Sequence, residues 1–554
     1  MNINNYLLQR PSIIIKTIAR FLGWLLLTTL CAEVASSPKQ TPIALGQRIY
    51  QHGTLAAGEP TTALVQGDVP VDGRQFSCMN CHRRSGMGAI EGDRIIPPVT
   101  GAALYHDSAQ FWTDIEGLMN ATPIQSVRPP SLPYRKRPAY TDETLAQAIR
   151  HGRGADGQPL DRLMPRYPFS DEAMAALIAY LKTLSAQFSP GVTSKEIYLA
   201  TVITEEVSAQ QQKAMLGVLN TYFREKNAQT RAERQRIHAG PFYHAYKNKA
   251  YRQWQLIPWV LTGTPEHWQA QLHAYYQQQP VFALISGIST QSWQPIHDFC
   301  AHQHLPCLLP NTDWPTADND FYTLYFSKGL ALEALAIAQY IDTQTTQAHI
   351  VQISKPNIQR IMRILPEYYQ DKPTYQISNW LLTQSGKQQR IAEADWVIFW
   401  LTADDIIEIV ADNKENQFMF SSTLLNGNFA AIPVSLRQRS RVAHLYTLPK
   451  VLTRRQRRLE LWLNSRGMKW LDKRIQAQTY FACLVMSEGL MHIQRYFYRD
   501  YLLDALDHAE NMGIYSIFYP RLSFGPGQRY LAKGSYIVAL AQDGSVIQDT
   551  WIVP

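Results

Sequence analysis

The chain has 554 residues, of which 45% are hydrophobic and 18% are charged. This length is enough for about three to four compact units, and the composition is that of a globular protein, which excludes disordered and fibrous classes. The net charge of +8 is modest for this size, and no nucleic-acid-binding motif accompanies it. We therefore expect no nucleic acid as a partner, whereas a basic surface could attract an acidic redox partner or anionic lipid.

The first 37 residues are typical of a secretory signal peptide. Basic residues precede an apolar run at 21–31, and small residues follow, so cleavage is expected after Ala35 or Ser36. The run is shorter than the roughly 20 residues that span a bilayer, so we predict an exported mature chain without a membrane span. An uncleaved anchor and a lipid attached at Cys31 stay open as alternatives.

A C-x-x-C-H motif stands at Cys78-Met79-Asn80-Cys81-His82 and is typical of covalent haem attachment in an exported protein. Two thiols three positions apart can each bind a haem vinyl group, and the histidine that follows can bind the iron. A redox C-x-x-C would give no role to His82. A zinc site would need a second ligand pair, and the sequence has no other C-x-x-C or C-x-x-H. We predict one covalently attached haem c.

The expected sixth iron ligand is Met164, which precedes Pro165 in a loop rich in glycine and proline, before a helix predicted for 170–184. A thioether raises the reduction potential relative to a second imidazole. Other candidates in this region lie too near His82 or are typical of packed helices or of the surface. They are Met87, Met119, Met174, His106 and His151.

Two further segments of this region have a predictable local structure. Residues 51–75 are rich in glycine and proline, which indicates an irregular loop. Residues 141–151 predict a helix, because Leu145, Ala148 and Ile149 fall on one face and Gly152 can end it.

Residues 41–187 resemble a class I c-type cytochrome domain, which is an all-α fold. Beside the C-x-x-C-H motif, the resemblance rests on the segments 44–50, 97–101, Met164-Pro165 and 179–181. It implies a first domain of residues 38–187 that transfers electrons through Cys78, Cys81, His82 and Met164. It also implies a redox partner protein and a periplasmic location, because that family attaches haem outside the bacterial inner membrane.

A short linker, residues 188–194, precedes a change of pattern. From residue 195 on, apolar runs typical of buried strands alternate with helices, which predicts βαβ units and parallel sheets. A hairpin that turns at Asp543-Gly544 is expected near the end. The predicted strands are 197–203, 256–261, 281–286, 349–353 and 396–400, and the predicted helices begin at Ser208, Thr264 and 331.

Residues 195–554 resemble the type 1 periplasmic binding proteins, the group of leucine/isoleucine/valine-binding receptors. The opening strand and helix at 197–224, the strand and loop at 282–290 and the segment 304–310 carry the resemblance. It implies two α/β lobes with a small-molecule ligand between them. The first lobe would cover about 195–343 with late return segments, and the second about 344–520.

The resemblance also implies ligand-binding positions at the carboxyl ends of strands. They are Thr204, Ser208, Ser289 and Thr290 on the first lobe and Thr402, Asp404 and Ser421 on the second. Asp404 could pair with a ligand ammonium, and each hydroxyl could instead cap a helix. Glu205 and Glu206 depart from the family's small residues and would repel an anionic ligand group. Either the ligand is not an ordinary amino acid, or the cleft has lost its original ligand.

We expect different states for the cysteines outside the C-x-x-C-H motif. Cys300 and Cys307 could form a disulfide in an oxidising compartment, whereas Cys483 lies in an apolar run and is expected to be a buried thiol.

The sequence shows no catalytic constellation, so we expect a periplasmic mono-haem electron carrier rather than an enzyme. Its second domain would dock a small molecule or a partner. Two alternatives stay open: a solute receptor of a transporter or sensor with a haem redox input, and the haem subunit of a periplasmic dehydrogenase.

Overall fold

The computed structural model describes residues 41–66, 68–91, 94–107, 137–237, 252–316, 320–383, 391, 393–406, 416–508 and 518–554. The predicted export signal and Met119 lie outside these residues. Within these described residues, contacts divide the chain into two units, one of 41–81, 101–107 and 137–184, and one of 82–100 and the described part of 185–554. Within the described ranges, no helix combines the length and apolar character that a membrane crossing requires.

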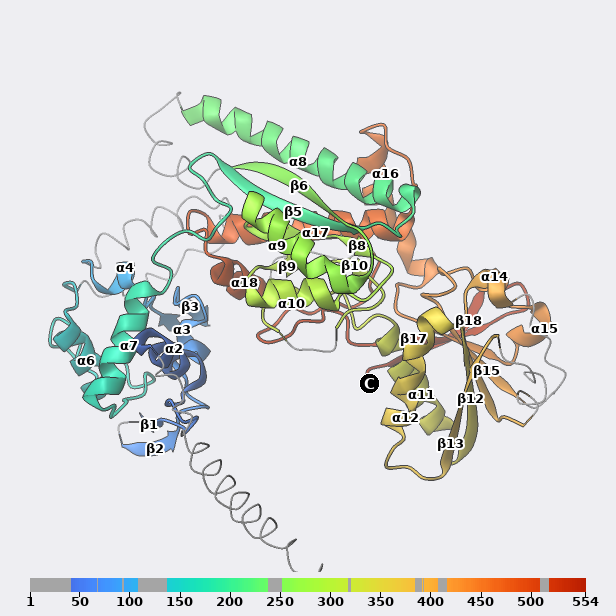
Figure 1. The fold of residues 1–554 in the computed structure, drawn as a ribbon, viewed down its shortest axis with the longest axis horizontal. Coiled ribbons are helices and arrows are strands. Elements are labelled where there is room, and N and C mark those ends of the chain that lie inside the picture. Colours follow the sequence, from blue (N-terminus) through green and yellow to red (C-terminus); the bar gives the residue numbers. More distant parts are fainter. Residues whose placement is uncertain are drawn as a thin grey trace, which may run out of the picture. The chain divides into compact units, whose positions relative to one another are not determined.

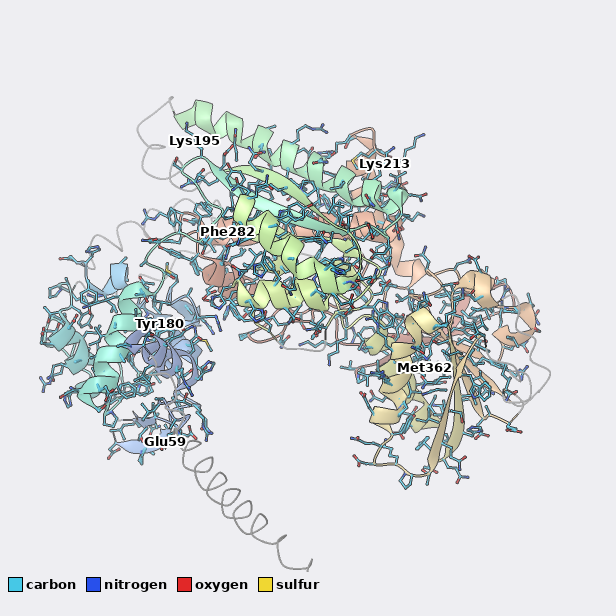
Figure 2. The ribbon with its side chains drawn as sticks, in the orientation of Figure 1. Glu59, Tyr180, Lys195, Lys213, Phe282 and Met362 are labelled. Carbon is cyan, nitrogen blue, oxygen red and sulfur yellow. The ribbon has the colours of Figure 1, made fainter. Side chains whose placement is uncertain are left out.

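The first unit is built on its first and last helices, α2 (Pro42–His52) and α7 (Asp171–Thr183). They approach closely at Gly46, where a Cβ atom would lie 2.0 Å from the Ala176 carbonyl oxygen. The rings of Tyr50 and Tyr180 pack 5.5 Å apart between the two helices, and Tyr180 is labelled in Figure 2. The predicted closing helix is confirmed, and its apolar face forms the core of this unit.

The remaining elements of the first unit are short. Helix α6 (Asp142–His151) is confirmed: Thr141 caps its start, and Gly152 ends it with a φ of 67°. The expected irregular loop at 51–75 instead contains a hairpin of β1 (Thr62–Val65) and β2 (Val69–Asp72). Its threonine and valines suit a paired strand, so the unit is not all-α as expected. The unit also contains the short helices α3 (Cys78–His82) and α4 (Gly101–Leu104).

Residues 82–100 belong by their contacts to the second unit, although the expected first domain ran unbroken from 38 to 187. The Ser85 N–H donates to the Asp504 carboxylate (2.9 Å), and the Ser185 hydroxyl donates to the Ser85 carbonyl (2.8 Å). This segment carries a second hairpin, β3 (Ala89–Glu91) and β4 (Arg94–Ile96).

The second unit contains two seven-stranded sheets (Figure 1). The first has the order β10-β8-β5-β7-β9-β11, with β6 also paired to β5, and all its named pairings are parallel. The predicted parallel arrangement and the strands at 197, 256 and 281 are therefore confirmed. The strands are β5 (Glu196–Thr204), β6 (Gln253–Leu261), β7 (Ala283–Ile285), β8 (Ile288–Ser289), β9 (Cys307–Leu308), β10 (Asn311–Thr312) and β11 (Thr323–Leu324).

Helices cover both faces of this first sheet. Met215 and Leu219 of α8 lie in the core of one face, whereas Trp268 and Phe299 lie in the core of the other. Thr264 precedes a 3₁₀ turn without forming the expected side-chain cap. The elements are α8 (Ala209–Ile237), η2 (Pro265–His267), α9 (Trp268–Gln278) and α10 (Gln294–His302).

The second sheet has the order β13-β12-β14-β15-β16-β17-β18, parallel as far as β16 and antiparallel beyond it. The expected hairpin is confirmed, because the Ser545 N–H donates to Asp543 (2.8 Å) and Gly544 has a φ of 85°. The strands are β12 (Ala348–Ser354), β13 (Tyr375–Leu381), β14 (Trp396–Trp400), β15 (Gln417–Ser421), β16 (Ser440–His444), β17 (Ser535–Leu540) and β18 (Val546–Ile552).

Helices also lie on both faces of the second sheet. Leu330 and Ile337 of α11 share one core with β12 and β14, and Ile406 and Leu436 share the other. Met362, labelled in Figure 2, belongs to the first of these cores. The elements are α11 (Leu330–Gln344), η3 (Pro356–Arg363), α12 (Ile364–Tyr368), α14 (Ala403–Ile406), η4 (Phe429–Ala431) and α15 (Val434–Arg437).

Three late helices follow the second sheet's parallel strands: α16 (Pro449–Asn464), α17 (Lys473–Ile493) and α18 (Arg499–Asp507). We expected the second lobe to extend to about 520, but Phe481, Met486 and Leu502 lie in the core of the first sheet. Helix α17 is buried along most of its length, and such a helix needs partners on several sides. The chain returns to the second sheet only with β17.

Candidate functional site

The two cysteines of the C-x-x-C-H motif lie on one short helix, α3. Cys78 is half-buried, and burial raises the pKa of its thiol to about 12, with a smaller contribution from the neighbouring Cys81. Cys81 is exposed. The helical turn places both sulfurs on one element, as the predicted double attachment of a haem requires.

The imidazole of His82 is held in one orientation. Its side chain is buried, with 8% of the residue exposed, and Nδ1 lies 2.8 Å from the Pro97 carbonyl oxygen. A carbonyl only accepts hydrogen bonds, so Nδ1 carries the proton and Nε2 keeps its lone pair. A metal-binding histidine characteristically has this second contact, which fixes its tautomer and its ring.

The loop that carries Met164 is tied to the segment just before Cys78. The Tyr167 hydroxyl donates to the Phe76 carbonyl (2.5 Å), and Arg166 pairs with Leu64 through two backbone hydrogen bonds of 2.8 and 2.9 Å. Burial and the nearby cysteines raise the pKa of Tyr167. The structure thus brings the Met164 loop and the cysteine helix into one neighbourhood of the first unit.

The alternative axial ligands differ in their surroundings. Met174 is buried in α7 as part of the helix core, and Met87 is half-buried. His106 and His151 are exposed, the latter at the end of α6. Of these side chains, Met174 has the packing expected of a core residue.

At the carboxyl edge of the first sheet, the predicted ligand positions converge on Glu206. Thr204 ends β5, and its hydroxyl donates to the Glu206 Oε1 atom. Ser289 ends β8, and its hydroxyl donates to the same oxygen (3.2 Å). The Thr290 N–H (3.1 Å) and hydroxyl (3.3 Å) also donate to it. Ser208 lies apart from this group and caps α8 by accepting from the Gln211 N–H (3.3 Å).

At the corresponding edge of the second sheet, Thr402 and Asp404 are not joined in one site. The Thr402 hydroxyl donates to Asp405 (2.7 Å), which also forms an ion pair with Lys355. Burial works to raise the pKa of Asp405, but the Lys355 and Thr402 hydrogen bonds outweigh it and lower the pKa. Asp404, the expected partner of a ligand ammonium, is exposed.

Ser421 belongs to a different group, centred on the fully buried Glu333 of α11. The Ser421 hydroxyl donates to this carboxylate, as do the Thr423 N–H (3.1 Å) and hydroxyl (2.8 Å). Burial raises the pKa of Glu333 to about 8. We did not predict this residue from the sequence, although a single acidic residue within the apolar run of 330–338 was a usable signal.

The Glu333 group continues through the Tyr446 hydroxyl. That hydroxyl lies 3.3 Å from Thr423 Oγ1 and accepts from Arg474 (3.1 Å), which forms an ion pair with Asp313. A polar chain therefore runs from α11, beside the second sheet, to the loop after β10 in the first sheet.

The remaining cysteines are buried. Cys300 and Cys307 are free thiols here, and burial together with a hydrogen bond to Cys307 raises the pKa of Cys300. Their pairing stays a prediction. Cys483 is a buried thiol, as expected.

Comparison with known proteins found no matching family model and no matching curated protein. Among solved structures, the chain is similar to the isoleucine-bound substrate-binding protein of a branched-chain amino acid transporter from Streptococcus pneumoniae. The identity is 9%, the coverage 65% of this chain and 100% of that one, and the TM-score 0.41.

Two further similar structures are also of transport proteins. A branched-chain amino acid ABC transporter protein from Thermus thermophilus, with bound valine, has 11% identity, 64% and 95% coverage and a TM-score of 0.45. An ABC transporter substrate-binding protein from Sphaerobacter thermophilus has 15% identity, 64% and 98% coverage and a TM-score of 0.45. Identities of this size concern the fold alone.

Proposed function

We propose that the chain is an exported periplasmic protein that carries one covalent haem c, joined to an α/β receptor unit that receives a small molecule or a partner protein. Cys78 and Cys81 would form the thioethers, His82 would be the proximal iron ligand and Met164 the distal one. When bound, the haem supplies one-electron transfer. The electron donor or acceptor would be a separate redox protein.

The observation that carries the haem proposal is the setting of His82. Its imidazole directly follows the cysteine pair, is buried, and has Nδ1 engaged by the Pro97 carbonyl. The Met164 loop adds support, because Tyr167 ties it to Phe76. The three solved structures described above are of ABC-type or amino acid transport proteins, so the haem proposal rests on these residues and not on the comparisons.

Haem attachment is tested by a Cys78→Ala/Cys81→Ala variant, produced in the periplasm of a host that matures c-type cytochromes. The wild type should keep its haem through acid-acetone extraction, and the variant should lose it. Cys483→Ala removes a buried thiol outside the motif and should keep full covalent haem. Covalent haem in the double variant would refute the proposal.

The distal ligand is tested by spectroscopy. A methionine sulfur on ferric iron gives a weak absorption band near the red end of the visible spectrum. Met164→His should abolish this band and lower the reduction potential, because imidazole favours ferric iron more than a thioether does. Met174→Leu, in the core of α7, should change neither. Loss of the band in the control alone would move the assignment to Met174.

The second candidate function is a solute receptor of a transporter or sensor, and it is the alternative that the comparisons favour. The specific observation is that hydroxyl and carboxylate side chains gather at the carboxyl ends of parallel strands in both sheets, where α/β proteins bind ligands.

Calorimetric titration of the haem-loaded full chain with a panel of amino acids, amines and polyols separates the candidates. Binding without a change in the haem spectrum would support the receptor. Haem reduction by the bound molecule would indicate the haem subunit of a dehydrogenase. Absence of binding would leave the electron carrier, with the α/β unit serving a partner protein.

A further inference from the structure

One carboxylate oxygen, Oε1 of Glu206, accepts hydrogen bonds from four donors at the carboxyl edge of the first sheet. The donors are the hydroxyls of Thr204, Ser289 and Thr290 and the backbone N–H of Thr290. They come from the adjacent ends of β5 and β8, which pair in parallel through Ile203 and Ile288. Two strand ends that lie side by side therefore aim donors at a single point.

Such a group of hydroxyl and backbone N–H donors is suited to an oxyanion. It lies outside the carboxyl ends of parallel strands, which is where open α/β sheets bind their ligands. Here the oxyanion is supplied by the chain itself, two residues after the end of β5. Burial works to raise the pKa of Glu206, but the hydrogen bonds from Thr204, Thr290 and Ser289 outweigh it and lower the pKa. The carboxylate therefore keeps its charge in this position.

We propose that Glu206 is an internal occupant of this oxyanion-binding group and that it excludes ligands which would anchor a carboxylate there. A free carboxylate would compete with one that the backbone holds in place, whose effective concentration is high. Glu206 is thus a specificity-determining residue. Its carboxylate engages the hydrogen-bond donors at this edge of the sheet, so a ligand meets a carboxylate there instead of free donors.

The inference deepens the proposed receptor function, on which its biological meaning rests. With its donors engaged, this edge favours ligands that offer amine or hydroxyl hydrogens and disfavours those anchored by a carboxylate. The proposal thereby gives a physical reason for the acidic residue at position 206, where the family resemblance implied a small one.

The test is rescue by acetate in the haem-loaded full chain. Glu206→Ala deletes one methylene and the carboxylate, a fragment the size of acetate. Acetate should raise the melting temperature of this variant toward that of the wild type, by about 1 °C, relative to sodium chloride of equal ionic strength. It should leave the wild type unchanged. Since Glu206 is exposed, its removal leaves the core intact.

Two matched variants complete the design. Glu206→Gln fills the same space, so acetate should not affect it. Glu205→Ala removes the neighbouring carboxylate but leaves Glu206 on its donors, so acetate should not affect it either. If Glu206→Ala does not fold, Glu206→Ser opens nearly the same space and replaces it.

The proposal is overturned if acetate fails to stabilise Glu206→Ala, or if it stabilises the wild type and Glu205→Ala to the same extent. Neither result depends on finding a natural ligand. A failed ligand screen would count against the receptor function alone, whereas a failed acetate rescue would count against the internal occupant alone.

Discussion

Glu206 and Glu333 accept hydrogen bonds at the carboxyl ends of parallel strands, one in each sheet, and they differ in their exposure to solvent. Glu206 lies at the edge of the first sheet and accepts from serine and threonine hydroxyls and one backbone N–H. Glu333 lies on α11, beside the second sheet, and accepts from the same kinds of donor at the end of β15. Glu206 is exposed, whereas Glu333 is fully buried.

The difference shows that burial, and not the donor set, decides the charge state. Hydrogen bonds lower the pKa of Glu206 although partial burial opposes them. Full burial raises the pKa of Glu333 to about 8 although similar bonds oppose it. Removing a carboxylate from water costs more than a few hydrogen bonds return, so the buried glutamate takes up a proton near neutral pH.

The largest expected effect comes from deleting the buried member of the pair. Glu333→Ala should lower the free energy of unfolding of the α/β unit by about 2–4 kcal/mol, because it leaves a cavity and buried donors without an acceptor. Glu206→Ala should cost less than about 1 kcal/mol, since water can replace the exposed carboxylate. Urea denaturation followed by tryptophan fluorescence measures both. Equal losses would remove burial as the distinguishing factor.

A second prediction concerns pH. The folded state holds the Glu333 proton more tightly than the unfolded state, because its pKa of about 8 exceeds the ordinary 4.5. The stability that this group contributes is therefore full below about pH 4.5 and is lost as the pH rises to about 8. The difference in unfolding free energy between the wild type and Glu333→Gln should fall across that window.

The corresponding comparison for Glu206 has the opposite sign. Its pKa is lowered on folding, so its contribution is present above the ordinary value of 4.5 and is lost as the pH falls through the folded pKa. The difference between the wild type and Glu206→Gln should therefore shrink only in acid. For Glu333, a difference in unfolding free energy between the wild type and Glu333→Gln that stays constant from pH 4.5 to 8 would contradict the raised pKa.

The smallest expected effect on stability concerns Tyr446, which belongs to the buried hydrogen-bonded group around Glu333. Tyr446→Phe removes the hydroxyl between Thr423 and Arg474 and should cost about 1 kcal/mol. A double-mutant cycle with Glu333→Gln should show coupling, because both side chains contact Thr423. Tyr275→Phe, which frees the Val260 carbonyl in the first sheet, should be additive with Glu333→Gln.

Some site contacts depend on residues far apart in the sequence. Thr290 reaches Glu206 across 84 positions, and Thr423 reaches Glu333 across 90. The family resemblance implied Thr204, Ser289, Thr290 and Ser421 as ligand positions, and that role stays a prediction. In the structure, Thr204, Ser289 and Ser421 end β5, β8 and β15, and Thr290 follows β8. The sequence could not show that the chain's own carboxylates hold them, because that depends on strand order and on which helix covers each sheet.

The sequence by itself determined the features whose signals are local. The spacing of Cys78, Cys81 and His82 and the capped helix α6 arise from helical geometry within a few residues. The apolar runs of β5 and β12 likewise identify buried strands. Only the tertiary structure decided that Pro97 orients His82, that α17 packs on the first sheet, and that Glu333 is buried. Each of these depends on long-range packing, and the free energy of such contacts is set by neighbours that sequence periodicity does not identify.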